Sequence, residues 1–284
     1  MLRVRQRSAP ARLLDDRDRA AALAVCDADP VANVFVASRI QTLGLEPGRV
    51  GAQIWGFEDN GQLASLCYAG ANLVPVQAAG PAVPAFAERA LRQGRRCSSL
   101  VGPSAAVTEL WGQLRSHWGP PRDVRAAQPL MAIEGPPLVP PDPAVRRVRM
   151  DEIDILMPAC VAMFTEEVGV SPLSGDGGAA YRARVTELVR SGRAFARIED
   201  GRVIFKAEVG AATPRACQVQ GVWVRPEFRG RGLAAPGMAA VVTEARRAIS
   251  PVVSLYVNDF NAPARATYHR AGFTEVGEFM SVLF

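Results

Sequence analysis

The segment Arg229-Gly-Arg-Gly-Leu-Ala234 has residue types and spacing that suit a phosphate group. Glycines in a turn let backbone amides approach a ligand closely. The segment lies between an expected strand that ends at Val224 and an expected helix that begins near Leu233. The first amides of a helix have no intrahelical partner, and the helix dipole adds roughly half a positive charge there. The pattern predicts an anion site suited to a pyrophosphate, although these glycines could also serve only to form a tight turn.

A second segment, Leu255–Phe273, favours the anion site over a simple turn as the interpretation of the first segment. It runs through an expected strand, Asn261 as a helix cap, a helix that carries Tyr268 two turns in, and a Gly-Phe exit. Together the two segments resemble the acetyl-CoA-binding core of the GNAT superfamily of N-acetyltransferases. The other interpretation of Tyr268 is an aromatic side chain packed in the core.

The GNAT signature is Arg/Gln-x-x-Gly-x-Gly/Ala after the fourth strand, and Arg229, Gly232 and Ala234 satisfy it. The end of the chain, from Tyr256 onward, is also similar to the branch that includes glycine N-acyltransferase-like enzymes. The resemblance covers residues 145–284. It implies acetyl-CoA as the acyl donor and a primary amine as the acceptor.

The resemblance also implies roles for particular residues. The strand before the turn would pair its backbone with pantetheine, with the acetyl carbonyl near the Val222 amide, and the amides from Arg229 to Ala235 would hold the pyrophosphate. Asn261 would contact the pantetheine arm, and Tyr268 would act as general acid for the departing thiolate. The acetyl-CoA contacts implied in this way are Val222, Trp223, Val224, Arg229, Gly230, Arg231, Gly232, Leu233, Ala234, Ala235, Asn261 and Arg265.

The chemistry that these residues would support needs no covalent enzyme intermediate. Attack of an amine on a thioester gives a tetrahedral oxyanion, which a backbone amide can stabilise. Relatives often carry a glutamate as general base on the fourth or fifth strand, but here the matching positions are Gln218, Gln220 and Tyr256. Glu208 on the neighbouring strand is the candidate base, and Glu166-Glu167 is the other carboxylate pair; each could instead be an ordinary surface acid.

The elements that must position these residues follow from hydrophobic periodicity. In the second half we expect strands at 145–149, 194–198, 203–209, 218–224, 252–257 and 274–284, and helices at 153–168, 179–189, 233–249 and 262–270. In the first half we expect a helical region over 15–41 interrupted near Pro30, strands at 53–57, 63–68, 98–101 and 129–133, and helices at 84–93 and 105–117. The predicted class is α/β (α+β), with a GNAT-type mixed, mostly antiparallel sheet flanked by helices.

A proline-rich stretch divides the chain. Residues 135–143 contain five prolines, which exclude a helix or a central strand. We therefore expect an N-terminal α/β domain at 1–135, a linker at 136–144 and a GNAT domain at 145–284. The first domain loosely resembles another GNAT unit but has no cofactor motif. It could be a degenerate unit of a tandem protein that supports the catalytic unit or lines its acceptor cleft.

Composition narrows the function further. The chain has 33 basic and 28 acidic residues, with Lys206 as the sole lysine, and the charges form no basic block that would favour nucleic acid. The five cysteines form no Cys-x-x-Cys pair, and there are two histidines, so neither a disulfide framework nor a metal site is expected. No apolar run is long enough to span a membrane, and we expect a cytoplasmic protein.

The sequence therefore predicts an acetyl-CoA-dependent N-acetyltransferase that acts on a small amine, an amino acid or a peptide N-terminus. The alternative is a non-catalytic acyl-CoA-binding module that senses its ligand and regulates a partner. Both share the anion turn, so a proton donor and a working base must separate them. The acceptor, the acyl chain length and the oligomeric state are not legible in the sequence.

Overall fold

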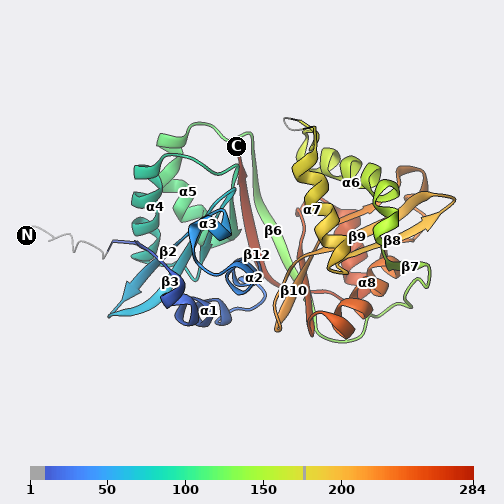
Figure 1. Ribbon diagram of the computed structural model, residues 1–284, viewed down its shortest axis with the longest axis horizontal. Coiled ribbons are helices and arrows are strands. Elements are labelled where there is room, and N and C mark those ends of the chain that lie inside the picture. The colour runs from blue at the N-terminus through green and yellow to red at the C-terminus, as the bar shows by residue number, and fades with distance from the viewer. Residues whose placement is uncertain (1–9, 175–176) are drawn as a thin grey trace, which may run out of the picture. The chain divides into compact units, whose positions relative to one another are not determined.

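A computed structural model describes residues 10–174 and 177–284 (Figure 1). The chain divides into two compact units. Unit 1 contains the described residues up to Leu130 together with Tyr256–Asp259 and Glu275–Phe284, and unit 2 contains Met131–Leu255 and Phe260–Thr274. None of the helices in the described ranges has the length and apolarity needed to cross a membrane.

Unit 1 is a sheet with helices on both faces. Its elements are β1 (Arg12–Leu13), η1 (Asp16–Asp18), α1 (Arg19–Asp27), α2 (Val34–Leu43), α3 (Pro47–Val50), β2 (Gln53–Asp59), β3 (Gln62–Ala69), β4 (Asn72–Val76), α4 (Ala82–Gln93), β5 (Ser99–Pro103), α5 (Ser104–Trp118), β6 (Asp123–Ile133) and β12 (Thr274–Leu283). The strand order is β1-β2-β3-β4-β5-β12-β6. Strands β4 and β5 pair in parallel, while β1 to β4, and β5 with β12, pair antiparallel.

Alternation along the strands places apolar side chains on both faces of this sheet. Trp55 packs with α4 and α5, whereas its neighbour Ile54 packs with α1 and α2. Asn60 and Gly61 form a two-residue turn between β2 and β3, and both adopt positive φ, as a hairpin turn with right-handed strand twist requires. Strand β4 was not predicted from the sequence.

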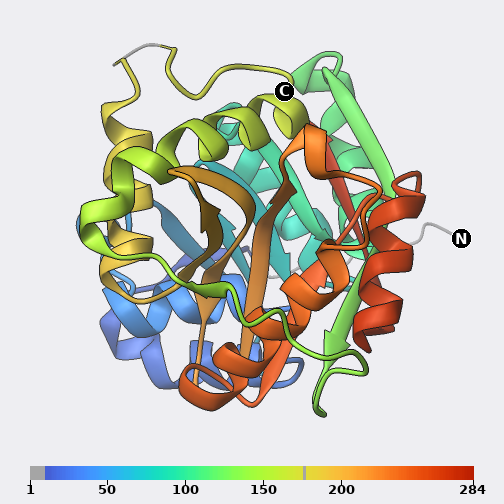
Figure 2. The same cartoon turned by 90° about the vertical axis from the view of Figure 1, so that its right-hand side faces the viewer.

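Unit 2 also consists of sheet strands with helices on both faces (Figure 2). Its elements are β7 (Val145–Arg147), η2 (Met150–Glu152), α6 (Ile153–Val168), α7 (Ala179–Arg190), β8 (Ala194–Glu199), β9 (Arg202–Ala212), β10 (Ala216–Val224), η3 (Pro226–Phe228), α8 (Ala234–Ala248), β11 (Val252–Tyr256) and α9 (Ala262–Ala271). The strand order is β11-β10-β9-β8-β7, with β10 and β11 parallel and β7 to β10 antiparallel. The predicted mixed, mostly antiparallel sheet flanked by helices is confirmed.

Both faces of the unit 2 sheet are covered. Helices α6 and α7 pack on one face, where Met163 and Val185 join the core with Trp223 of β10. Helix α8 covers the other face, where Gly237 lies so close to the Phe205 ring that a Cβ there would be 2.9 Å from it. Strand β9 is therefore buried along nearly its whole length.

The last strand of the chain differs from the expectation that 145–284 forms one domain. Strand β12 pairs with β5 of unit 1, in a register that places Phe279 opposite Pro103 and Leu283 opposite Ser99. Beyond it, the Phe284 ring packs edge-on against two tryptophans of α5. The sequence pattern predicts that this segment is a strand, but alternation carries no information about which strand it joins.

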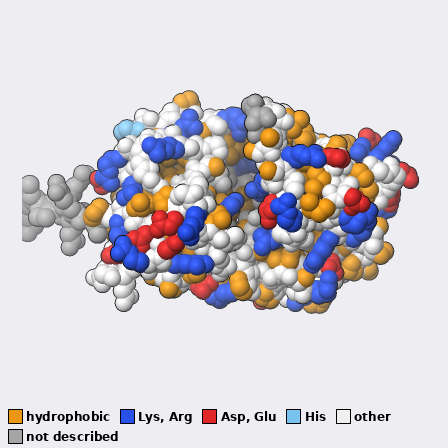
Figure 3. Space-filling model, viewed as in Figure 1, with side chains coloured by type: hydrophobic (Ala, Val, Ile, Leu, Met, Phe, Trp, Pro, Cys, Tyr) orange, Lys and Arg blue, Asp and Glu red, His pale blue; other side chains and the backbone are white. Residues whose placement is uncertain are grey.

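The proline-rich stretch forms neither a helix nor a strand, and it belongs to unit 2. The Leu138 amide donates to the Ala271 carbonyl at 3.1 Å, and the Asp142 amide donates to the Pro236 carbonyl at 3.0 Å. Asp142 also accepts from Arg197 at 2.9 Å. On the molecular face in Figure 3, basic and acidic side chains are interspersed.

Candidate functional site

The site is built on strand β10, which loses its parallel neighbour before it ends. The pairing with β11 runs through three register positions and, among the described residues, its last pair is Gln218 with Ser254. Strand β10 continues to Val224 along β9. The register with β9 shifts between Gln220 and Trp223, which marks a bulge. The last residues of β10 therefore present a backbone edge on the side that β11 has left.

Gly221 makes this bulge possible. Its φ is +59°, in the left-handed region that side chains rarely adopt. A Cβ there would lie 3.0 Å from Lys206 Nζ and from Met163 Cε, and 3.2 Å from Glu208 Cδ. A side chain at this position would therefore be strained, because its backbone would be in a disfavoured conformation and its Cβ would press against three side-chain atoms.

The predicted anion turn follows β10. Gly230 and Gly232 both have φ of +74°, and a Cβ added at either would meet nothing within 4 Å, so the space above the turn is open. Helix α8 begins at Ala234 with no acidic residue in its first turn. Pro236 lacks an amide hydrogen, so the Ala234 and Ala235 amides are the donors at this helix end. The turn thus fits a pyrophosphate through backbone geometry and the helix dipole.

A pocket of about 650 Å³ joins the end of β10, the turn and the first two turns of α9. The residues expected from the sequence that line it are Val222, Trp223, Val224, Arg229, Gly230, Gly232, Leu233, Ala234, Ala235, Asn261 and Tyr268. Arg231, Arg265 and Glu208 are not among its lining residues. The guanidinium of Arg231 lies 4.9 Å from the centroid of the Phe228 ring instead.

Arg229 makes contacts that the sequence did not indicate. Its Nη2 donates to Glu166 Oε2 at 2.7 Å, and its Nε donates to the Val224 carbonyl at 2.9 Å. Glu166 also accepts from the Trp223 indole at 3.2 Å. The guanidinium of Arg229 is thus directed to Glu166 of α6, while the turn offers its backbone amides. No local pattern could have paired Glu166 with Arg229, because the two residues are 63 positions apart in the sequence.

Tyr268 is held in the pocket wall by helix α9. Asn261 caps this helix, with its side-chain oxygen accepting from the Ala264 amide at 3.2 Å. The Tyr268 side chain is 7% exposed, and its ring meets that of Phe273 edge-on at 6.0 Å. Burial, with a smaller contribution from the Glu167 charge, raises the pKa of Tyr268, so the hydroxyl stays protonated as a proton donor must. Tyr268 is thus both packed and adjacent to the pocket.

Several other α9 residues line the pocket without having been predicted. Ala264 lies four residues before Tyr268, and Pro263 lies four residues before Thr267; residues at this spacing share a helix face. The helical spacing around Tyr268 could have found them.

Glu208 lies beneath the bulge in a buried ion pair. Lys206 Nζ lies 3.1 Å from its Oε2, and Gln220 Nε2 donates to its Oε1 at 2.8 Å. Burial alone would raise the pKa of Glu208, but the Lys206 charge and the Gln220 hydrogen bond outweigh it and lower that pKa. The interpretation of Glu208 as an ordinary surface acid is wrong, because α6 and the bulge cover it and it is 6% exposed.

Comparison with known proteins agrees with this geometry. Residues 177–273 match the profile of the Acetyltransferase (GNAT) family. The chain contains a GNAT acetyltransferase domain. Residues 52–156 match the profile of a domain of unknown function, DUF4081. Among curated proteins, no sequence matches the chain significantly.

Solved structures share the fold of this chain along nearly its whole length. A GCN5-related N-acetyltransferase from Sphaerobacter thermophilus has a TM-score of 0.62 at 17% identity, covering 98% of this chain and 96% of its own. A Drosophila protein has a TM-score of 0.66 at 14% identity, covering 96% and 98%. A tandem GNAT protein from the clavulanic acid biosynthesis pathway has a TM-score of 0.55 at 15% identity, with the same coverage. At these identities the likeness establishes the fold.

Proposed function

We propose that unit 2 is an acetyl-CoA-dependent N-acetyltransferase that moves an acyl group to a primary amine of a small molecule, an amino acid or a peptide N-terminus. The observation that carries the proposal is a single pocket that contains the free edge of β10, the glycine turn and the buried hydroxyl-bearing Tyr268. A cytosolic setting belongs to the proposal and is supported by five buried free thiols. The likeness of the chain's end to the glycine N-acyltransferase-like branch also remains part of it.

In this proposal the residues divide into binding and reacting groups. Backbone groups of Val222, Trp223 and Val224 would pair with pantetheine, the amides from Arg229 to Ala235 would hold the pyrophosphate, and Asn261 and Arg265 would complete the contacts from α9. When bound, acetyl-CoA supplies a thioester whose acyl carbon an amine attacks. The Val222 amide would donate to the developing oxyanion, and the Tyr268 hydroxyl would give its proton to the departing thiolate.

We assign the general base to Glu208. Its carboxyl group is next to the bulge residue that precedes Val222, and Lys206 keeps it ionised and able to accept a proton. Because it is not in the pocket wall, a water would carry the proton from the amine. Glu166 lies in the wall but is occupied by Arg229 and Trp223. Comparison of Glu208→Gln with Glu166→Gln separates the two carboxylates: we expect the first to remove the acidic limb of the pH profile of kcat/KM.

Unit 1 would be a degenerate GNAT unit without a cofactor of its own. Its order of strand, helices, three strands, helix, strand, helix and strand repeats in the second half of the chain, and each copy has one parallel strand pair before its end. The residues after β4, Gln77-Ala-Ala-Gly-Pro-Ala82, do fit the spacing Arg/Gln-x-x-Gly-x-Gly/Ala, so the expectation that this half has no cofactor motif is wrong. They differ from the unit 2 turn in having Gln77 in place of Arg229 and Pro81, which lacks an amide hydrogen, in place of Leu233. The acyl-donor site is assigned to unit 2 because its glycine turn shares a pocket with the end of β10 and Tyr268.

The test measures thiol release from acetyl-CoA across a panel of amines, with acetyl-CoA binding measured separately by calorimetry. Tyr268→Phe should lower kcat by about 100-fold or more while the affinity for acetyl-CoA is retained, because one proton donor is lost and no binding group. Tyr256→Phe, outside the pocket, is the matched control. Tight binding without turnover on any amine would favour a regulatory acyl-CoA sensor, and absence of binding would refute the assignment of the site.

A further inference from the structure

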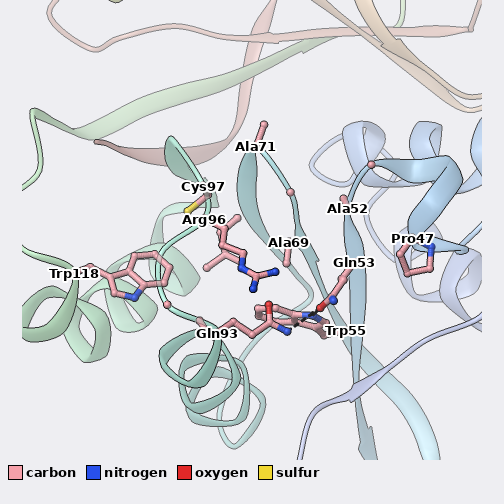
Figure 4. A pocket seen from close by; sticks show the side chains of 15 residues that line it. Pro47, Ala52, Gln53, Trp55, Ala69, Ala71, Gln93, Arg96, Cys97 and Trp118 are labelled. Atoms are coloured by element: carbon pink, nitrogen blue, oxygen red, sulfur yellow. Dashed lines mark hydrogen bonds between the residues drawn. The ribbon is translucent and has the colours of Figure 1, made fainter.

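Unit 1 has a pocket of its own, with a volume of about 380 Å³ (Figure 4). Small-molecule sites commonly have volumes of about 300–1,000 Å³. The starts of β2 and β4, the end of β3 and the C-terminal end of α4 form it. The acyl-donor pocket of unit 2 lies at the end of β10 and the N-terminal end of α8 instead. The unit 1 pocket is therefore no remnant of a second acyl-donor site.

Two carboxamides in this pocket are oriented by a tryptophan. Gln53 Oε1 accepts from Trp55 Nε1 at 2.9 Å and from Gln93 Nε2 at 2.8 Å (Figure 4). An indole N–H can only donate, so the atom that faces it must be the oxygen of Gln53, and the atom of Gln93 that faces this oxygen must be its nitrogen. The network leaves the amide nitrogen of Gln53 as a donor and the amide oxygen of Gln93 as an acceptor. These two groups complement a secondary amide, whose carbonyl accepts a hydrogen bond and whose N–H donates one.

A cation stands beside the two carboxamides. Figure 4 shows the guanidinium of Arg96 extending into the pocket toward Gln53 and Gln93. The described residues that line the pocket include no Asp or Glu, and no ion pair found among the described residues involves Arg96. Its neighbour Arg95 is used differently, because its guanidinium lies 4.7 Å from the centroid of the Phe284 ring. Arg96 is thus available for an anionic group, and a carboxylate matches its planar fork.

The rest of the wall is apolar. Ala69, Leu73 and Ala90 line it together with the indole of Trp118. The polar groups occupy one side, where the C-terminal end of α4 carries Gln93, and the partial negative charge of a helix C-terminus favours a donor such as an amide N–H. The site thus offers an anion-binding group, an amide-binding pair and a small apolar surface.

We propose that this pocket binds a small carboxylate that carries a secondary amide and an aliphatic or flat side group, which is the chemistry of an N-acylated amino acid or of a peptide C-terminus. The carboxylate pairs with Arg96, the amide carbonyl accepts from Gln53, and the amide N–H donates to Gln93. The side group lies on the apolar wall. The binding is independent of the acyl transfer proposed for unit 2.

The experiment uses the full chain and calorimetric titration with N-acetyl-leucine. Two analogues test the two recognised groups separately, because N-acetyl-leucinamide lacks the carboxylate and 4-methylpentanoate lacks the amide. We expect each to bind about tenfold or more weakly, because a charge-assisted contact or a pair of amide hydrogen bonds is lost. Arg96→Gln should weaken N-acetyl-leucine binding to a similar extent. Arg92→Gln, an equally charged change on α4 outside the pocket wall, should leave the binding unchanged.

Each other result overturns the proposal. Failure of N-acetyl-leucine to bind at about 10 mM removes the site. Equal affinity for N-acetyl-leucinamide would show that the pocket does not recognise the carboxylate. Equal affinity for 4-methylpentanoate would show that it does not recognise the amide. Binding that Arg96→Gln leaves intact means that the ligand occupies another place, the unit 2 pocket included. Because the Arg96 side chain is exposed, its replacement should not unfold the protein, and an unchanged melting temperature verifies this.

Discussion

Lys206 Nζ lies 3.1 Å from Glu208 Oε2, and the two side chains are 1% and 8% exposed. They are two residues apart on β9 and therefore on the same face of the sheet, under α6 and the β10 bulge. The only lysine of the chain is thus used to hold one buried carboxylate ionised beside the residues that form the acyl-donor pocket.

Removing the lysine should therefore destabilise the protein strongly. We expect Lys206→Met to lower the free energy of unfolding at pH 7 by about 3–5 kcal/mol, since the Glu208 charge is left buried and unpaired. The double change Lys206→Met with Glu208→Gln should recover most of the loss. Without its partner, burial raises the pKa of Glu208 above its unfolded value, so the deficit should shrink as the pH falls through that raised pKa. Urea denaturation measures both effects, and equal stability of the single and double variants would contradict the ion-pair argument.

Gly221→Ala tests the bulge. We expect a loss of about 2–3 kcal/mol, since the substitution adds backbone strain and a methyl group that meets three side-chain atoms at 3.0–3.2 Å. Gly201→Ala is the control, because Gly201 has φ of +68° but open space around its Cβ. It should lose only the strain, about 1 kcal/mol. If the two variants are equally stable in thermal unfolding, the contacts beneath the bulge do not matter.

Gly232→Ala should act on ligand binding more than on stability. The added methyl points into the open space above the turn, where a pyrophosphate must approach the backbone, so we expect acetyl-CoA to bind about tenfold or more weakly. Gly61→Ala in the β2–β3 turn has nearly the same positive φ and the same open surroundings, so it should match the loss in stability and leave binding intact. Calorimetry on both variants decides whether the turn is a binding site or only a connection.

Glu152 should make unit 2 sensitive to acid. Hydrogen bonds from Arg146 lower the pKa of Glu152 from its ordinary 4.5 to about 2. Because this pKa is lower in the folded protein than in the unfolded chain, the ionised Glu152 stabilises the folded state at pH values above the unfolded pKa. This contribution is lost as the pH falls from about 4.5 to about 2. Allowing for the half-exposed Arg146, we expect the loss to be about 1–2 kcal/mol. Glu152→Gln should flatten this slope in denaturation at several pH values, whereas Glu187→Gln, in an exposed pair with Arg190, should leave it unchanged.

The sequence predicted most elements of both units because their apolar periods are clear. It missed β4, whose five residues include Pro75 and are too few for a visible alternation. The candidate site was predictable where it consists of local backbone geometry: the glycines, the start of α8 and Tyr268 on α9 meet in one pocket. Such features can be predicted because they depend on residues that are close together in the sequence.

What could not be predicted depends on contacts between distant segments. The β9 pattern marks Glu208 as polar, and only α6 and the bulge turn that position into a buried one. Arg229 is similar, since the choice between a ligand phosphate and a carboxylate of α6 is made by tertiary structure. The placement of β12 depends on pairing energies that a single strand does not reveal.

The position of β12 also determines the order in which the two units can complete their folding during synthesis. Unit 1 is encoded first, yet its sheet lacks the strand between β5 and β6 until residues that follow all of unit 2 have left the ribosome. During synthesis the edges of those two strands remain unpaired, and unpaired edges are prone to wrong association. The sheet of unit 1 is thus completed only after unit 2 has been made, and a chain that stopped before β12 would lack a strand of the unit that was made first.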